Sequence, residues 1–296
     1  MPSELVPSDN PQEPVRLFLP ELLSGSQGRW FPITRPVITE VHCRTALSKS
    51  GIYGVDYSLN PYFGCEHSCI YCYVPRMMPG RLRGRAWGEF VEVKVDIPEV
   101  LARELRRASR GRVLVSSITD PYQPVERSYE LTRRCLGLLA SKGFEVTILT
   151  KSSLFKRDLD LMDEERFEVG VTVTTIKAHR ELEPFSDPPL RRLEALKEAS
   201  EEGLSTFVFL GPLIPGVVDE ELDEILELAY NAGASYVIVD KLNTKGDVVE
   251  SIAKVLSEES VDKFLKALSS KAWLEGMKVK IANMCGKLRL QYDFCF

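Results

Sequence analysis

Apolar and polar positions alternate in blocks along most of the chain after residue 91. Short blocks rich in β-branched residues have the composition of strands buried in a parallel sheet. Longer blocks, several of which end at a glycine, are typical of helices. Strands are predicted over residues 112–117, 145–150, 168–174, 206–210 and 236–239, and helices over 131–142, 154–162, 189–202 and 220–232. Further helices are expected from about Val248 and Val261.

This alternation predicts a parallel sheet with right-handed crossovers. Counting from the strand that leads into residues 60–73, the pattern contains about six strand–helix units. A closed eight-unit barrel takes about 250 residues for its units and needs more strands than are visible. The predicted fold is therefore α/β, an open partial (β/α)6 barrel related to the TIM barrel.

Three segments are expected along the chain. Residues 1–36, rich in proline and polar residues, are predicted to be an N-terminal extension, which precedes a strand near Val37–Val41. Residues 37–245 contain the barrel. Residues 246–296 are predicted to be C-terminal helices and a tail whose apolar end, Phe294-Cys295-Phe296, docks on the barrel.

Composition limits the cellular location and the kinds of partner that are expected for the protein. Of its 296 residues 44% are hydrophobic, enough for a large core, and the net charge of −5 does not indicate a polyanionic partner. The start of the chain has no basic and apolar signal pattern, and no apolar run is long enough to cross a bilayer. Seven cysteines, an odd number, do not suggest a disulfide framework. We therefore expect a cytoplasmic monomer or dimer with no membrane partner.

Three of the cysteines, Cys65, Cys69 and Cys72, lie within eight positions at C-x3-C-x2-C spacing. Three thiolates on one short loop suit a 4Fe–4S cluster that keeps one iron open, whereas a fully protein-ligated cluster takes four. A structural zinc ion would need a fourth ligand, and no second Cys or His pair is present at matching spacing. His67 lies between two of the cysteines and is expected to point away from the metal.

The segment Asn60–Tyr73, read as N-P-Y-F-G-C-E-H-S-C-I-Y-C-Y, resembles the cluster motif of the radical S-adenosylmethionine (SAM) superfamily. Tyr71 stands in its aromatic position, and the flanking residues resemble the branch of spore photoproduct lyase. The resemblance, which runs from about Pro36 to Asn243, implies that the open iron holds the amino and carboxylate groups of SAM. An electron from the cluster then cleaves SAM to a 5′-deoxyadenosyl radical. It also implies an electron donor of the flavodoxin or ferredoxin type.

In parallel α/β folds the functional residues follow the carboxyl ends of the strands. The resemblance adds that Lys151 contacts the SAM carboxylate, that Tyr71 and the segment around Ile214 flank the adenine, and that Asp219 takes the acidic position of that segment. The predicted cofactor-binding residues are Tyr71, Thr119, Lys151, Thr172, Glu183, Arg192, Ile214 and Asp219. The predicted substrate-side residues are Asp120, Tyr122, Gln123, Asp240, Lys241 and Asn243.

Two features leave the reaction open. Spore photoproduct lyase returns a hydrogen atom from a cysteine just after the second strand, where this chain has Ser116-Ser117. A hydroxyl group is a poorer donor, so Cys43, Cys135, Cys285 or Cys295 would have to replace it, and Cys135 is expected in the core. The arginine-rich residues 76–87, with Trp87 for stacking, suit either phosphate binding or a solvated loop.

The sequence thus predicts a radical SAM enzyme whose leading substrate is a nucleic acid or nucleotide, as in DNA repair by a lyase. One alternative is the same chemistry on a protein side chain or a small metabolite. The other is a protein that binds an iron–sulfur cluster, zinc or nucleic acid without catalysis.

Overall fold

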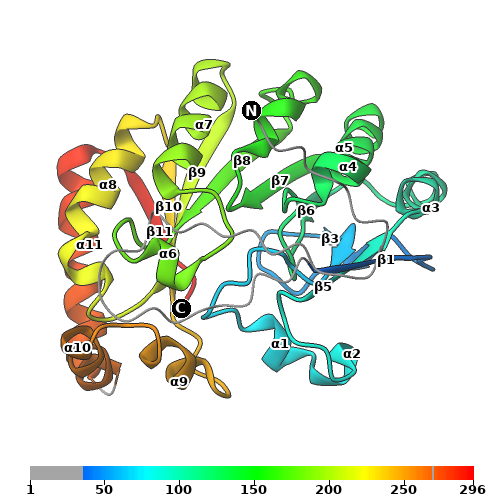
Figure 1. Ribbon diagram of the computed structural model, residues 1–296. Helices are drawn as coiled ribbons and strands as arrows, with labels where there is room; N and C mark the ends of the chain where they lie inside the picture. The colour runs from blue at the N-terminus through cyan, green and yellow to red at the C-terminus, as the bar shows by residue number, and fades with distance from the viewer. Residues whose placement is uncertain (1–35, 269) are drawn as a thin grey trace, which may run out of the picture. The chain divides into compact units, whose positions relative to one another are not determined.

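The computed structural model describes residues 36–268 and 270–296, and residues 36–296 form one compact unit (Figure 1). The predicted N-terminal extension, apart from Pro36, lies outside the described residues. The division of the rest at residue 245 stays a prediction. No helix in the described part of the chain is long and apolar enough to span a membrane.

The centre of the fold is an eight-stranded sheet in the order β11-β10-β9-β8-β7-β6-β3-β2. Its strands are β2 (Leu47–Lys49), β3 (Tyr57–Leu59), β6 (Arg112–Val115), β7 (Glu145–Thr150), β8 (Phe167–Val173), β9 (Ser205–Leu213), β10 (Tyr236–Lys241) and β11 (Gln291–Phe294). All neighbours pair in parallel except β2 and β3, which are antiparallel. The predicted open barrel is formed by six strands that are neighbours in this sheet: β3, β6, β7, β8, β9 and β10.

Helices cover the outer face of this sheet (Figure 1). The longer ones are α3 (Ile97–Glu104), α5 (Leu131–Lys142), α7 (Pro189–Glu201), α8 (Leu222–Asn231), α10 (Glu258–Leu268) and α11 (Lys271–Leu288). Shorter turns are α1 (Val74–Met77), α2 (Pro79–Leu82), α4 (Glu126–Tyr129), α6 (His179–Leu182), η2 (Val218–Glu220) and α9 (Val248–Ala253). The helix predicted over 154–162 is instead a 3-10 helix, η1 (Leu154–Leu161).

A small second sheet in the order β1-β5-β4 carries the start of the cysteine loop. It contains β1 (Val37–Val41), β4 (Tyr62–Phe63) and β5 (Phe90–Lys94). The predicted strand at residues 37–41 is therefore present but belongs to this sheet, and β3 is the barrel strand that leads into the loop. Gly64 follows β4 at φ +91°, and a Cβ there would lie 2.2 Å from the backbone oxygen of Phe90. Only glycine fits this approach, which sets where the loop begins.

The C-terminal tail extends the main sheet. Strand β11 pairs in parallel with β10, with Phe294 opposite Val239, and the Cys295 N–H donates to the Val239 carbonyl at 2.9 Å. Helix α11 packs against α8, and Phe296 lies beneath the Lys241 ammonium, 5.2 Å from the ring centroid. The tail thus covers the edge of β10, which would otherwise expose unpaired backbone groups.

Candidate active site

A cavity of about 340 Å³ opens at the carboxyl ends of the barrel strands. Eleven of the predicted site residues line it: Cys65, Cys69, Tyr71, Cys72, Thr119, Asp120, Lys151, Thr172, Asp240, Lys241 and Asn243. They come from the cysteine loop and from the ends of β6, β7, β8 and β10. The topology therefore brings together residues that are up to 178 positions apart, between Cys65 and Asn243.

The cysteine loop is held by hydrogen bonds to the segment after β6. The Thr119 hydroxyl and the Gln123 amide both donate to the Gly64 carbonyl, at 2.7 and 3.2 Å. The Asn60 side-chain oxygen accepts from the two backbone N–H groups that follow Ser116, at 3.0 and 3.2 Å. These bonds fix the loop on the rim of the barrel, so the thiols face the cavity from one side.

The three thiols fit an iron–sulfur cluster. Burial raises the pKa of Cys65 to about 12 and also raises the pKa values of Cys69 and Cys72. Ionisation of three such thiols requires cations nearby, which irons supply. Among the described residues, no three His, Cys, Asp or Glu side chains converge as for a single metal ion. A cubane has a separate iron for each thiolate, so its ligands need not meet at one point.

Asp120 links the loop to two barrel strands. Its carboxylate accepts from the Thr150 hydroxyl at 2.6 Å and from the Lys151 N–H at 2.7 Å. His67 Nδ1 lies 3.4 Å from the same carboxylate, and His67 belongs to the cavity lining. Burial raises the pKa of Asp120, but His67 and the hydrogen bonds outweigh this and lower the pKa to about 2. Asp120 is therefore ionised, and its carboxylate oxygens accept hydrogen bonds from groups of the protein.

Lys151 brings a positive charge to the cavity. Its side chain is half-buried, and Nζ lies 5.7 Å from the centroid of the Tyr71 ring. It forms no ion pair with the side chains that the structure describes within 4.0 Å. A half-buried ammonium facing a cavity favours an anionic ligand, such as a carboxylate.

Glu183 and Arg192 do not line the cavity, which differs from the prediction for both. Arg192 is 0% exposed and Glu183 is 1% exposed, and the two form an ion pair. Arg192 also donates to the carbonyl groups of Thr172 at 2.8 Å and Asp187 at 2.6 Å. Because each charge is neutralised inside the protein, neither is available to a ligand.

The buried pair acts on the cavity through Tyr71. The Tyr71 hydroxyl bonds to Glu183 and lies 2.9 Å from the Thr174 hydroxyl. Burial and the charge of Glu183 raise the pKa of Tyr71, which keeps it a phenol that can donate. The pair thus holds the ring of Tyr71 in the wall beside the thiols.

Four further predicted residues also lie outside the lining. Ile214 is buried in a small apolar cluster with Tyr71, and the Asp219 carboxylate accepts from the indole N–H of Trp273 at 2.6 Å. Tyr122 is buried against Phe155, and Gln123 supports the cysteine loop. The acidic residue Asp219 therefore joins η2 to α11 in this structure.

Sequence reasoning missed several residues of the lining. Gly211 and Pro212 line the cavity because β9 continues to Leu213, three residues beyond its predicted end, and Phe209 lines it from inside the predicted strand. Ser116 also lines it, at φ 67°, and its hydroxyl is buried without a hydrogen-bond partner among the described residues. If the strand had been predicted over the whole run 205–213, Gly211 and Pro212 would have been expected at its carboxyl end.

The arginine-rich segment is mainly structural. Arg76 donates to the Cys72 carbonyl and pairs with Asp247. Arg81 lies 3.9 Å above the Phe63 ring and Arg85 lies 3.8 Å above the Phe90 ring. Trp87, at the end of the segment, packs against two of these aromatic rings and lines the cavity. Three of the four arginines in this segment thus contact other groups of the protein. This favours the interpretation of the segment as a surface loop over a role in phosphate binding.

None of the four remaining cysteines lines the cavity. Cys135 is buried in the main core, as predicted, and Cys285 is buried there too. Cys43 lies against Asp96, where burial and that carboxylate raise its pKa to about 11. Cys295 is exposed beside the end of β10. Spore photoproduct lyase has a cysteine where this chain has Ser116. Apart from Cys65, Cys69 and Cys72, no cysteine of the described residues lines the cavity and could take its place.

An open parallel barrel with three thiols facing a cavity at its carboxyl edge defines an iron–sulfur enzyme architecture. The profile of the Radical SAM superfamily matches residues 59–229, and the chain belongs to this superfamily. The fold, the family and the class of enzyme predicted from the sequence are thus confirmed, and the non-catalytic alternative is not supported. Membership implies a 4Fe–4S cluster and SAM as cofactors.

The chain is also similar to individual proteins in sequence and in fold. An uncharacterized protein of Methanocaldococcus jannaschii is 34% identical over 187 residues, which cover 62% of this chain and 70% of that protein. A radical SAM Nalpha-GlyT isomerase of Pseudomonas phage M6 is 23% identical over 185 residues, 60% of this chain and 38% of that protein. The solved structure of spore photoproduct lyase complexed with dinucleoside spore photoproduct has a TM-score of 0.69 at 12% identity, covering 88% of this chain and 82% of that chain. This last likeness shows the fold alone.

Proposed function

We propose that this protein is a radical SAM enzyme that removes a hydrogen atom from a nucleic acid or nucleotide. The observation that carries the proposal is the set of residues that line one cavity. Three thiols form one wall, and Asp240, Lys241 and Asn243 at the end of β10 belong to the same lining. When bound to Cys65, Cys69 and Cys72, the cluster would supply the electron that cleaves SAM to a 5′-deoxyadenosyl radical.

The side chains of the cavity have distinct tasks in this proposal. Lys151 binds the carboxylate of SAM, because it is the half-buried ammonium that follows β7 and forms no ion pair within 4.0 Å with the described residues. Trp87 and Phe209 close the lining with apolar surface and keep water from a reactive site. The unpartnered hydroxyl of Ser116 offers a hydrogen bond to the bound ligand.

The substrate class has two lines of support. Asp240, Lys241 and Asn243 place an acceptor, a donor and an amide in one lining, a set that suits the polar edge of a base. The solved structure with a similar fold, spore photoproduct lyase, was determined in complex with dinucleoside spore photoproduct. A protein side chain or a small metabolite is the alternative substrate. We further propose a flavodoxin- or ferredoxin-type electron donor and a cytoplasmic location.

Transfer of deuterium tests the proposal. The anaerobically reconstituted and reduced protein is incubated with SAM and with deuterated DNA, RNA, nucleotides or peptides in parallel. Mass spectrometry of the released 5′-deoxyadenosine then shows which substrate gave up its hydrogen. We expect deuterium from a nucleic acid or nucleotide, and none with Cys69→Ala protein. Deuterium from peptides alone would move the assignment to the alternative substrate.

A further inference from the structure

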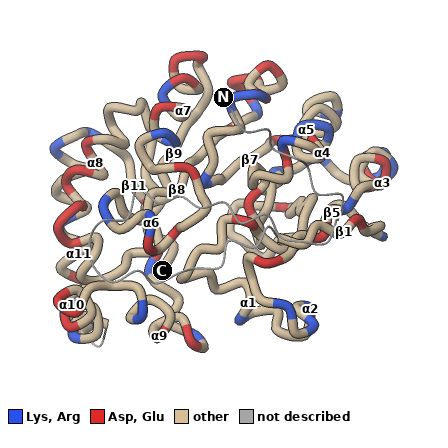
Figure 2. The backbone as a smooth tube through the Cα atoms, in the orientation of Figure 1, with Lys and Arg blue, Asp and Glu red and all other residues tan. Residues whose placement is uncertain are grey.

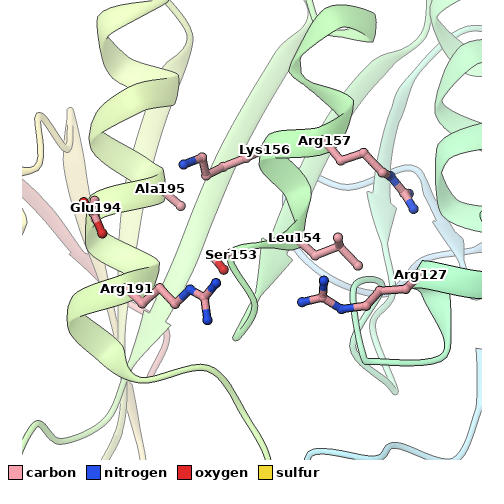
Figure 3. A pocket seen from close by; sticks show the side chains of 8 residues that line it. All are labelled: Arg127, Ser153, Leu154, Lys156, Arg157, Arg191, Glu194 and Ala195. Atoms are coloured by element: carbon pink, nitrogen blue, oxygen red, sulfur yellow. The ribbon is translucent and has the colours of Figure 1, made fainter.

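A second cavity of about 370 Å³ lies between α4, η1 and α7. Four of the eight residues that line it are cationic: Arg127, Lys156, Arg157 and Arg191. Glu194 is the single acid of the lining. Figure 3 shows these side chains around a space that Ser153 and Leu154 border. This concentration of positive charge stands out on a protein whose net charge is −5.

Two of the cations converge without a partner. Arg127 comes from α4 and Arg191 from α7, and both guanidinium groups point toward the space in front of Ser153 (Figure 3). Both residues are exposed, and within residues 36–268 and 270–296 neither side chain forms an ion pair or hydrogen bond. Two like charges that face one space repel each other, and an anion between them removes this cost.

The nearby acids do not supply that anion. Glu198 pairs with Lys156, and Glu126 pairs with Arg157 at 2.8 Å. The Asp187 carboxylate accepts from the Ser153 N–H at 2.6 Å and from its hydroxyl at 2.7 Å. Burial raises the pKa of Asp187, but these bonds together with the charge of Arg191 outweigh this and lower it, although Asp187 and Arg191 form no ion pair within 4.0 Å. In Figure 3 Glu194 lies on the side of α7 that faces away from Arg127. Among the described residues, Arg127 therefore has no acid that pairs with it, and Arg191 is offset only in part, by the more distant Asp187.

The cavity borders the candidate active site. Ser153 follows Lys151 by two residues, so their Cα atoms are at most about 7 Å apart. Lys151 lines the active-site cavity, whereas Ser153 lines this one. The short segment that follows β7 therefore borders both cavities. A chain-like ligand held between the two arginines could follow this segment into the active site.

We propose that Arg127 and Arg191 form a binding site for a phosphate group. Guanidinium groups bind phosphate oxygens in pairs of hydrogen bonds, which favours phosphate over smaller anions. Resting on the proposed function, we assign the phosphate to a phosphodiester beside the target nucleotide of a polynucleotide. The same chemistry would serve the phosphate of a free nucleotide, and the experiment separates these two sources.

The test measures binding, not turnover, on the reconstituted protein. Fluorescence anisotropy follows a labelled single-stranded oligonucleotide over a range of KCl concentrations. The variant Arg127→Gln/Arg191→Gln is compared with Arg106→Gln/Arg107→Gln, which removes the same charge from exposed arginines near the end of α3. A second arm titrates a nucleoside monophosphate and inorganic phosphate. All four substituted arginines are exposed, so circular dichroism of both variants should match the unchanged protein.

We expect the Arg127/Arg191 variant to bind the oligonucleotide about tenfold more weakly, with a salt slope reduced by about 0.7 for one lost phosphate contact. The control variant should change affinity less than about twofold, since its charges lie outside the cavity. A monophosphate that binds as tightly as the oligonucleotide, and loses as much in the variant, would support the phosphate site but assign it to a free nucleotide. Equal losses in the two variants would overturn the site.

Failure of this site and failure of the proposed function are distinguishable. If deuterium transfer from nucleic acids is seen while both variants bind alike, the substrate class stands and the phosphate site falls. If the arginine pair binds phosphate compounds but no nucleic acid or nucleotide gives up deuterium, the site stands and the proposed substrate class falls.

Discussion

Replacement of Arg192 by Met should strongly destabilise the protein. Arg192 is fully buried, and its removal leaves the Glu183 carboxylate charged and unpaired in the interior. Breaking such a pair costs about 3–5 kcal/mol of the free energy of unfolding. The neighbouring substitution Arg191→Met is the matched control. Arg191 is exposed, so the control should change the free energy of unfolding by less than about 0.5 kcal/mol.

The pKa of Glu183 gives a second estimate of the same magnitude. Burial raises this pKa, but Arg192, Lys151 and the hydrogen bonds outweigh it and lower the pKa from 4.5 to about 2. At about 1.4 kcal/mol per pKa unit, this corresponds to about 3 kcal/mol. Because the folded-state pKa is the lower one, the stabilisation is complete above about pH 4.5 and is lost as the pH falls toward 2.

Urea denaturation followed by circular dichroism, at neutral pH and at about pH 3, measures both effects. The difference between the Arg192→Met protein and the Arg191→Met protein should shrink at the lower pH. The double variant Glu183→Gln/Arg192→Met should recover part of the lost stability, since no buried charge is left unpaired. If Arg192→Met is as stable as its control but binds SAM more weakly, Arg192 reaches the cofactor and the buried-pair argument is wrong.

Three further predictions concern the active site and its loop. Replacing Cys65, Cys69 or Cys72 by Ala should abolish the visible absorbance of the reconstituted cluster, because each thiolate is expected to bind one iron. Lys151→Met should keep that absorbance and weaken SAM binding about 10- to 100-fold in equilibrium dialysis, because a charged hydrogen bond is lost. Gly64→Ala should destabilise the protein by about 3 kcal/mol or more in urea denaturation, since its Cβ would lie 2.2 Å from a backbone oxygen at φ +91°.

Each of these predictions has a control in the chain. Cys285→Ala and Cys295→Ala should leave the iron content unchanged, because neither residue lines the cavity. Lys245→Met removes an exposed lysine and should not alter SAM binding. Gly80→Ala adds a methyl group where no atom lies within 4 Å and should be tolerated. An unchanged SAM affinity in Lys151→Met protein, or iron loss in the Cys285 or Cys295 variants, would contradict the assignment of the site.

The order of the strands and helices in the barrel could be predicted from the sequence alone, and so could the three cysteines that are expected to bind the cluster. Strands in a parallel sheet are buried on both faces, so their apolar runs are visible without the fold. The predicted bounds of β7 (Glu145–Thr150) match the structure for this reason, and those of α5 (Leu131–Lys142) match because Gly143 ends the helix at φ 69°. The three cysteines are also local, because one short loop carries them all. Lys151 was readable as a polar residue at the end of a buried strand.

Burial and partners of polar residues were decided by the tertiary structure. Arg191 and Arg192 are neighbours in sequence, yet one is exposed and the other is 0% exposed. Successive residues of an α-helix point about 100° apart, so only one of the two faces the sheet. Helical spacing places position 192 on the face of Leu196 and Ala199, but the sequence does not show that a buried acid neutralises Arg192, because this acid lies on another segment. Glu183 was expected at the cofactor from the family resemblance and is found buried outside the cavity lining.

The same limit applies wherever distant segments meet. Strand β11 was not predicted as a strand, since its pairing with β10 depends on the place where α11 ends. The second cavity is built from α4, η1 and α7, whose residues are separated by more than 60 positions between Arg127 and Arg191. A periodic pattern reports which face of an element is apolar, but not which charges from other elements come to lie beside it. Charge pairing is a property of the packed chain, and it is here that the structure adds to the sequence.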